Sequence, residues 1–234
     1  MDTTGLFVDS AKKFYDETRA DENSGSRSWE HCYKAFGEAR ALSEPDFDHL
    51  SLHLAFYLAS WGMYRASSFL VKKDYRVHIP AVKEILKADY DPLYGTDCAV
   101  YKEKPARRLL GKIYGELGSY YKGVRDSVRP GVASPVSETL ITKILMGTLG
   151  CAPAYDRYFC AGLKTDKRFS RVFGIESISQ LTDFYLGNIE EFETLRESFS
   201  RRGVKYPQMK LIDMGFWQIG FDLENPKKEN TSRE

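Results

Sequence analysis

Residues 52–70 read LHLAFYLASWGMYRASSFL, the most apolar run of the chain. The run is nearly as long as the roughly 20 apolar residues that a membrane-spanning helix needs. It also contains His53, Arg65 and three serines, so we expect a buried helix and no membrane span. Its composition suits a central helix covered on most sides by other helices, with Gly62 and the serines allowing neighbours to approach.

Apolar residues recur with helical spacing along most of the chain, and strand-like alternation is nearly absent. Gly- and Pro-containing breakers separate the candidate helices. These helices are expected over residues 6–19, 28–41, 47–71, 78–88, 104–123, 135–147, 153–164, 177–200 and 206–220. The sequence predicts an all-α fold, a compact bundle of about nine helices in one body or two lobes. We assign residues 1–221 to one domain and 222–234 to a flexible polar tail.

Composition narrows the class of protein. Of 234 residues, 42% are hydrophobic and 14% aromatic, enough to build a core, so disorder is not expected. The four cysteines contain no CxxC pair, so we predict neither an iron–sulfur cluster nor a structural zinc site. No cofactor is expected. No signal-type segment begins the sequence, and a reduced, cytoplasmic, monomeric protein that does not enter a membrane is expected.

The net charge of +1 hides an uneven distribution. Residues 1–100 hold 12 basic and 16 acidic side chains, and residues 172–234 hold 8 and 11. Residues 101–171 hold 14 basic and 6 acidic side chains, a balance of +8. A polyanion such as double-stranded DNA would therefore bind the middle third, 101–171. The alternative is a solvated basic face without a partner.

The segment 130–159 reads PGVASPVSETLITKILMGTLGCAPAYDRYF. After a Pro-Gly turn, Ser134 is a good N-cap for a helix with Pro135 at its first position. Gly150 is a good terminator of that helix, and a Pro-containing loop then leads to Asp156 at the start of the next one.

This order resembles the helix-hairpin-helix DNA glycosylases, the superfamily of endonuclease III, the adenine glycosylase of mismatch repair and the alkyladenine and oxoguanine glycosylases. Residues 130–132 are similar to the hairpin, which would lie near 123–147, and Tyr155-Asp156 is similar to the dipeptide that carries the catalytic Asp. The chain departs from the family at Ala133, at Tyr155 and at Arg157-Tyr158, and its helix is about three residues longer. The resemblance covers roughly an eighth of the chain.

The resemblance implies that Asp156 is catalytic and that the turn binds DNA. Backbone N–H groups at a helix start attract phosphate, which assigns contacts to Gly131, Val132 and Ser134. Further phosphate contacts are expected from the nearby basic side chains Arg125, Arg129, Lys143 and Arg157. Alternatively, Asp156 does no more than cap the helix that follows it.

A glycosylase flips its target base into a pocket, which needs aromatic faces and polar groups. We assign this base pocket to Tyr155, Trp61, His53, Trp217 and Asp213. The alternatives are core packing for the aromatic side chains and an ion pair between Asp213 and an arginine such as Arg65.

Bifunctional members of the family carry a Lys on the hairpin helix, and the matching region 134–137 has none. We therefore predict a monofunctional enzyme that hydrolyses the bond to the base and leaves an abasic site. Lys143 is interpreted as a phosphate contact or a solvated side chain. The base would be a damaged one, in repair, or a modified one in phage DNA, in antiviral defence.

Two other classes of function remain open. One is a non-catalytic helical regulator or antitoxin that binds nucleic acid or protein through residues 101–171. The other is a metal-dependent hydrolase, because the i, i+4 spacing of His49 and His53 can place two imidazoles on one helix face. No Glu follows His49 as in an HExxH motif, so a metal site is not expected.

Overall fold

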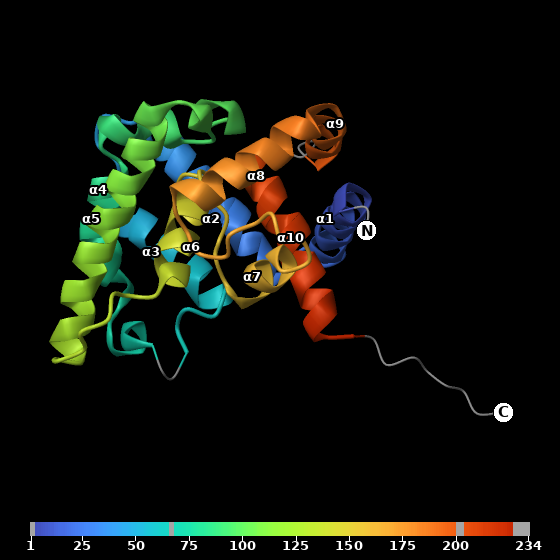
Figure 1. Ribbon diagram of the computed structural model, residues 1–234. Helices are drawn as coiled ribbons and strands as arrows, with labels where there is room; N and C mark the ends of the chain where they lie inside the picture. Colours follow the sequence, from blue (N-terminus) through green and yellow to red (C-terminus); the bar gives the residue numbers. More distant parts are fainter. Residues whose placement is uncertain (1–2, 66–67, 200–203, 227–234) are drawn as a thin grey trace.

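A computed structural model describes residues 3–65, 68–199 and 204–226. Within these ranges the chain forms ten α-helices and five short 3-10 helices, with no β-strand, which confirms the all-α fold (Figure 1). Among the described helices, none combines the length and apolar character that crossing a membrane requires.

The α-helices are α1 (Thr3–Arg19), α2 (Ser28–Ala39), α3 (Phe47–Ser60), α4 (Ile79–Ile85), α5 (Lys104–Val128), α6 (Glu138–Thr148), α7 (Arg157–Leu163), α8 (Ile175–Gly187), α9 (Ile189–Phe199) and α10 (Gln208–Glu224). The 3-10 helices are Gly25–Arg27, Phe69–Lys72, Tyr75–His78, Ala88–Leu93 and Cys98–Lys102.

The apolar run at residues 52–70 does not form one continuous helix. Helix α3 ends at Ser60, and Gly62 adopts a φ of +75°, a backbone conformation that residues other than Gly rarely adopt. The expectation of a helix covered on most sides is also wrong, because Leu52 and Phe56 are 50% and 63% exposed. At the end of the run, a short 3-10 helix begins at Phe69.

Helix boundaries differ from the sequence prediction at several other places. The helix expected over 177–200 is two helices, α8 and α9, which meet at Asn188. The helix expected from Pro135 begins at Glu138 with Ser137 as its N-cap, so Ser134 does not cap it. Residues 222–224, expected to belong to a flexible tail, are part of α10, which extends to Glu224, and residues 227–234 lie outside the described ranges.

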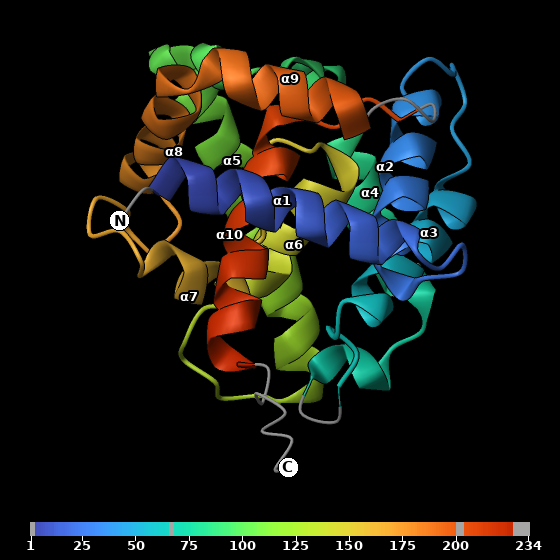
Figure 2. The ribbon, with the colours of Figure 1, turned by 90° about the vertical axis from the view of Figure 1, so that its right-hand side faces the viewer.

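Helix α10 is buried along most of its length. Helix α1 crosses it on one side, as Figure 2 shows, and α7 packs against it on another. Two glycines allow α7 and α10 to touch backbone to backbone: a Cβ on Gly220 would overlap the carbonyl oxygen of Tyr158, and one on Gly162 would overlap that of Phe216. This crossing brings the start of α7 beside the side chains of α10.

Replacing Gly220 by Ala is expected to destabilise the protein by about 2–3 kcal/mol, because the obstacle is backbone that cannot rotate away. The matched control is Gly115→Ala on α5, where an added methyl group meets no atom within 4 Å. That substitution should stabilise the helix by about 0.5–1 kcal/mol. Urea denaturation measures both, and two changes of the same sign would contradict the assignment of this crossing.

Candidate active site

The loop between α6 and α7 is buried and is held by side chains from distant helices. Gly150, with a φ of +63°, ends α6 as predicted. Asp213 on α10 accepts a hydrogen bond from the N–H of Ala154 at 2.9 Å. Thr142 on α6 accepts one from the N–H of Tyr155, also at 2.9 Å. These bonds fix the position of Asp156, the next residue along the chain.

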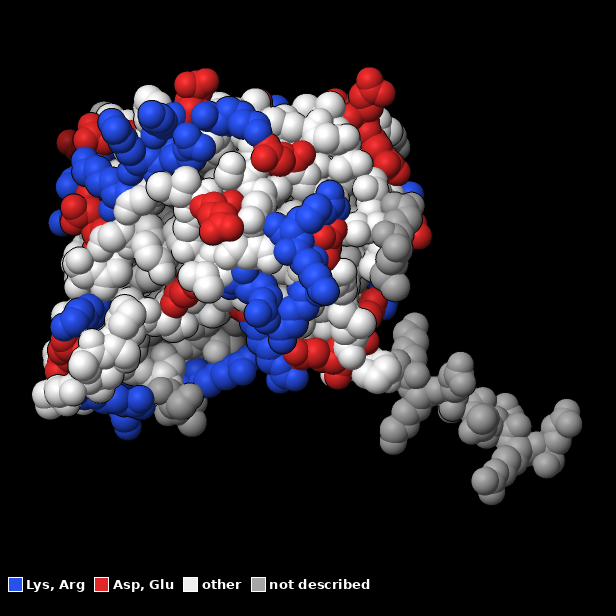
Figure 3. All heavy atoms as spheres, in the orientation of Figure 1, with Lys and Arg blue, Asp and Glu red and all other residues white. Residues whose placement is uncertain are grey.

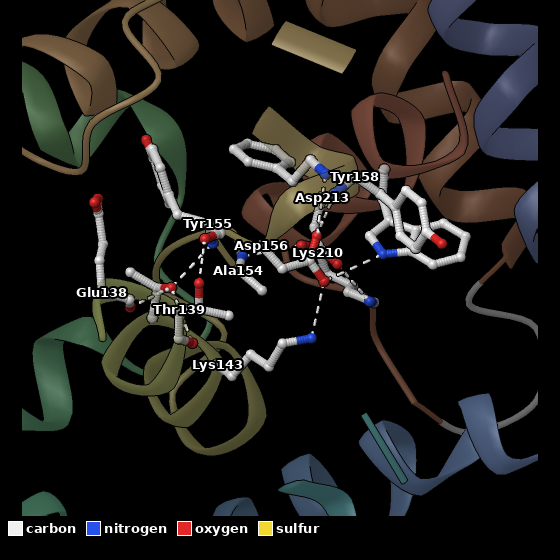
Figure 4. A network of polar contacts seen from close by, with 12 residues as sticks. Glu138, Thr139, Lys143, Ala154, Tyr155, Asp156, Tyr158, Lys210 and Asp213 are labelled. Carbon is white, nitrogen blue, oxygen red and sulfur yellow. Dashed lines mark hydrogen bonds and ion pairs between the residues drawn. The ribbon is translucent and has the colours of Figure 1, made fainter. Parts of the chain in front are cut away.

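Both carboxylate oxygens of Asp156 accept hydrogen bonds (Figure 4). Its Oδ1 accepts hydrogen bonds from the N–H groups of Tyr158 and Phe159, both at 3.1 Å, so Asp156 caps α7. Its Oδ2 accepts from the Nζ of Lys143 at 2.9 Å and from the Nε1 of Trp217 at 3.3 Å. The side chains of Lys143 and Asp156 are only 4% and 13% exposed. Capping therefore accounts for one oxygen, and the other belongs to a buried ion pair.

A second buried ion pair lies next to the first. The Nζ of Lys210 is 2.7 Å from the Oδ2 of Asp213, and these side chains are 3% and 4% exposed. The ring of Trp61 contacts both ammonium groups, with Lys143 at 5.1 Å and Lys210 at 5.4 Å from its centre. The Nε1 of Trp61 is buried and has no hydrogen-bond partner among the residues that the structure describes.

The two ion pairs and the two tryptophans enclose a cavity of about 10 Å³. That space is about one water molecule in size and cannot hold a nucleobase. Trp61 and Trp217 line this cavity, and their rings meet edge to face at 6.0 Å. A base could enter only if one of these rings moved.

Three of the residues assigned to the base pocket, Trp61, Trp217 and Asp213, line the same cavity as Asp156. Tyr155 does not: its ring is buried, and its hydroxyl shares a hydrogen bond with Ser177 at 2.5 Å. His53 does not either. It lies one turn before Tyr57 on α3, in a groove beside α2, where burial lowers its pKa from the usual value.

The Pro-Gly turn follows α5 and is exposed. Gly131 has a φ of +85°, and an added Cβ there would meet no atom within 4 Å. Val132 is 38% exposed, and Ser134 and Arg129 are exposed as well. The turn borders an open groove of about 350 Å³, whose other wall is the segment around Gly62.

Two of the basic residues assigned to DNA contacts have structural partners instead. Arg125 is 7% exposed and donates to the carbonyl oxygens of Ser134 and Val132, at 2.5 and 2.9 Å. It therefore shapes the turn from inside. Lys143 is buried in its pair with Asp156, so its interpretation as a phosphate contact or solvated side chain is wrong.

The basic surface divides into patches (Figure 3). One lies over the beginning of α5, and another surrounds α7 and the loop that follows it. Arg157 belongs to the second patch; it is 73% exposed and pairs with Glu224. The same loop carries Lys164, Lys167 and Arg171, for which no ion pair within 4 Å is found in the described residues.

The sequence did not point to Lys210 and Tyr57, which also line the central cavity, the small cavity beside Asp156 and the two tryptophans. The i, i+3 spacing of Lys210 and Asp213 was a visible signal, because side chains three apart share one face of a helix. An arginine such as Arg65 was expected to pair with Asp213, but its partner is Lys210. Tyr57 follows His53 by one turn of α3, and only the tertiary structure separates their environments.

The segment after Trp61 is anchored by a buried histidine. His78 shares a hydrogen bond with the hydroxyl of Tyr64 at 2.7 Å and another with that of Tyr121, on α5, at 2.6 Å. Burial lowers the pKa of His78 to about 4. The folded protein therefore keeps this imidazole neutral at pH values where an unfolded chain, with a His pKa of about 6.5, would protonate it.

We expect His78 to make the protein less stable in acid. Between pH 6.5 and pH 4 the imidazole of His78 is protonated in the unfolded state but not in the folded state. The free energy of unfolding therefore decreases as the pH is lowered over this interval, by roughly 3 kcal/mol in total. Urea denaturation at several pH values measures the slope. The His78→Gln variant should show a shallower slope over this interval, and an identical slope would contradict the assignment.

Comparison of the chain with protein-family models, with curated proteins and with solved structures gives no match.

Proposed function

We propose that the protein is a DNA glycosylase that flips out a damaged or modified base and excises it, with Asp156 as the catalytic carboxylate. The observation that supports this proposal best is the buried pair of Asp156 and Lys143 beside two tryptophan rings. A buried ion pair is a costly arrangement for stability alone. Charges held in place before the substrate binds can stabilise the charge that develops in a transition state.

The carboxylate suits the chemistry of base excision. As the bond between the sugar C1′ and the base nitrogen breaks, its electron pair leaves with the base and the sugar gains oxocarbenium character. An ionised Asp156 near C1′ would stabilise that charge and orient a water molecule. The water oxygen bonds to C1′, its proton passes to Asp156 and then to the base, and an abasic site remains.

DNA would lie across the exposed turn at Gly131 and the basic patch around α7. The target base would enter by displacing the ring of Trp61 or Trp217, since the present cavity of about 10 Å³ is too small for it. The unpartnered Nε1 of Trp61 would then be a donor for the edge of the base. The aromatic rings would provide stacking surfaces that offset the cost of unstacking.

A second candidate, a glycosylase with strand-cleaving activity, is favoured by the position of Lys143. Its Nζ lies 2.9 Å from Asp156, which could accept its proton and free an amine. The amine would then attack C1′ in place of water, and the bond to the base would break with its electron pair leaving on the base. Opening of the C1′–O4′ bond, with a proton taken up by O4′, would then give a Schiff base. β-Elimination would then break the DNA strand.

The test uses the purified full chain and duplex oligonucleotides that each carry one damaged or modified base, together with intact phage DNA that contains modified bases. Strand breaks that appear only after alkali would support hydrolysis. Breaks without alkali, and a covalent product trapped by borohydride, would support the role of Lys143. Binding with no abasic site on any substrate would contradict both candidates and favour the non-catalytic regulator.

A further inference from the structure

A pair of histidines lies in a groove away from the candidate active site. His49 and His53 project from α3 into the space between α3 and α2, two helices that pack side by side (Figure 2). The groove has a volume of about 300 Å³ and shares no lining residue with the central cavity. His49 and His53 therefore take no part in the reaction proposed for Asp156.

The Nε2 atoms of the two imidazoles lie within hydrogen-bond distance of each other. Their Nε2 atoms are 3.0 Å apart, and the ring planes are inclined by 77°. Metal–nitrogen bonds of about 2.0–2.1 Å place two ligands about 2.9 Å apart at a right angle and about 3.3–3.4 Å apart at a tetrahedral angle. The observed separation is that of neighbouring corners of a square-planar or octahedral ion.

We propose that His49 and His53 form a two-imidazole binding site for a divalent transition-metal ion of tetragonal geometry, Cu²⁺ or Ni²⁺. Imidazole nitrogen suits these ions, whereas Mg²⁺ and Ca²⁺ prefer oxygen ligands. No cluster of three or more His, Cys, Asp or Glu side chains with metal-binding geometry exists in the described parts of the chain. The protein therefore supplies two ligands, and water completes the coordination shell.

The surroundings of the pair are compatible with a cation. Asp46 lines the groove and accepts a hydrogen bond from the N–H of His49, which fixes the first turn of α3. Glu38 and Lys34 also line it, and their charged atoms are 3.7 Å apart, so the ammonium group of Lys34 is paired with a carboxylate. His31 contributes a third imidazole to the groove wall from α2, without completing a three-residue cluster.

The proposal is tested by titrating the full chain, without a polyhistidine tag, with Cu²⁺, Ni²⁺, Zn²⁺ and Mg²⁺ in a calorimeter. We expect one Cu²⁺ or Ni²⁺ ion per chain, weaker binding of Zn²⁺ and none of Mg²⁺. His49→Ala and His53→Ala should each weaken Cu²⁺ binding by at least about tenfold, since each removes half of the chelate. The electron paramagnetic resonance spectrum of bound Cu²⁺ should show two equatorial nitrogen ligands.

Two matched variants complete the experiment. His78→Gln removes a histidine buried far from solvent, and His31→Ala removes the groove histidine that is not a proposed ligand. Both should keep the affinity for Cu²⁺ within about threefold of the parent chain. The proposal is overturned if His49→Ala or His53→Ala weakens binding no more than His31→Ala does. In that case the contact between the two rings is only a hydrogen bond.

Discussion

Asp156→Asn is expected to lower the rate of base excision by at least about 10²–10³-fold, because the variant cannot supply a negative charge to the sugar in the transition state. Asn is nearly the same size, and its side-chain oxygen can still accept the hydrogen bonds of the α7 cap. The measurement is single-turnover excision from the best substrate, followed by alkali. Retention of the parent rate would contradict the catalytic role.

This experiment needs a control for stability, since Asp156→Asn also leaves the ammonium group of Lys143 buried without a counter-charge. Breaking a buried pair in this way costs roughly 3–5 kcal/mol. Combining Asp156→Asn with Lys143→Gln removes both charges and should recover much of that loss. Excision should nevertheless stay low in the double variant, which separates the chemical role from the structural one. Asp183→Asn, at an exposed ion pair on α8, should change neither stability nor activity.

The helical fold and the place of Asp156 could be predicted because both depend on local sequence. Helical periodicity is a pattern of residues three or four positions apart in the sequence. Gly150 ends α6 because it adopts a positive φ, a conformation that Gly adopts readily. Asp156 begins α7 because short acidic side chains cap helices. The end of α3 at Ser60 was missed because the apolar pattern continues past Gly62, although the helix does not.

The partners of the charged residues could not be predicted in the same way. Lys143 and Arg125 both belong to the basic third of the sequence, and their spacing does not tell a buried side chain from a solvated one. Asp156 reaches Lys143 only because Gly150 turns the chain back toward α6. Likewise, Trp61 and Trp217 are distant in sequence and meet only where α3 and α10 approach the same cavity.

Lys210→Met is expected to destabilise the protein by roughly 3–5 kcal/mol, which corresponds to a fall in melting temperature of about 10 °C. Met fills a similar volume among the rings of Phe14, Trp29 and Trp61, which surround the ammonium group at 5.0–5.4 Å. The carboxylate of Asp213, however, would remain 4% exposed with no cation beside it. Thermal denaturation measures the change.

Adding Asp213→Asn to Lys210→Met should restore much of the stability. The Asn oxygen can still accept the hydrogen bond from the N–H of Ala154, and no uncompensated charge remains. Lys87→Met, at an exposed i, i+3 pair with Glu84, should leave the melting temperature unchanged. A single variant as stable as this control would show that Lys210 contributes only through its aliphatic stem. A double variant no more stable than the single one would mean that the ammonium group, and not charge balance, holds α10 against the loop that carries Asp156.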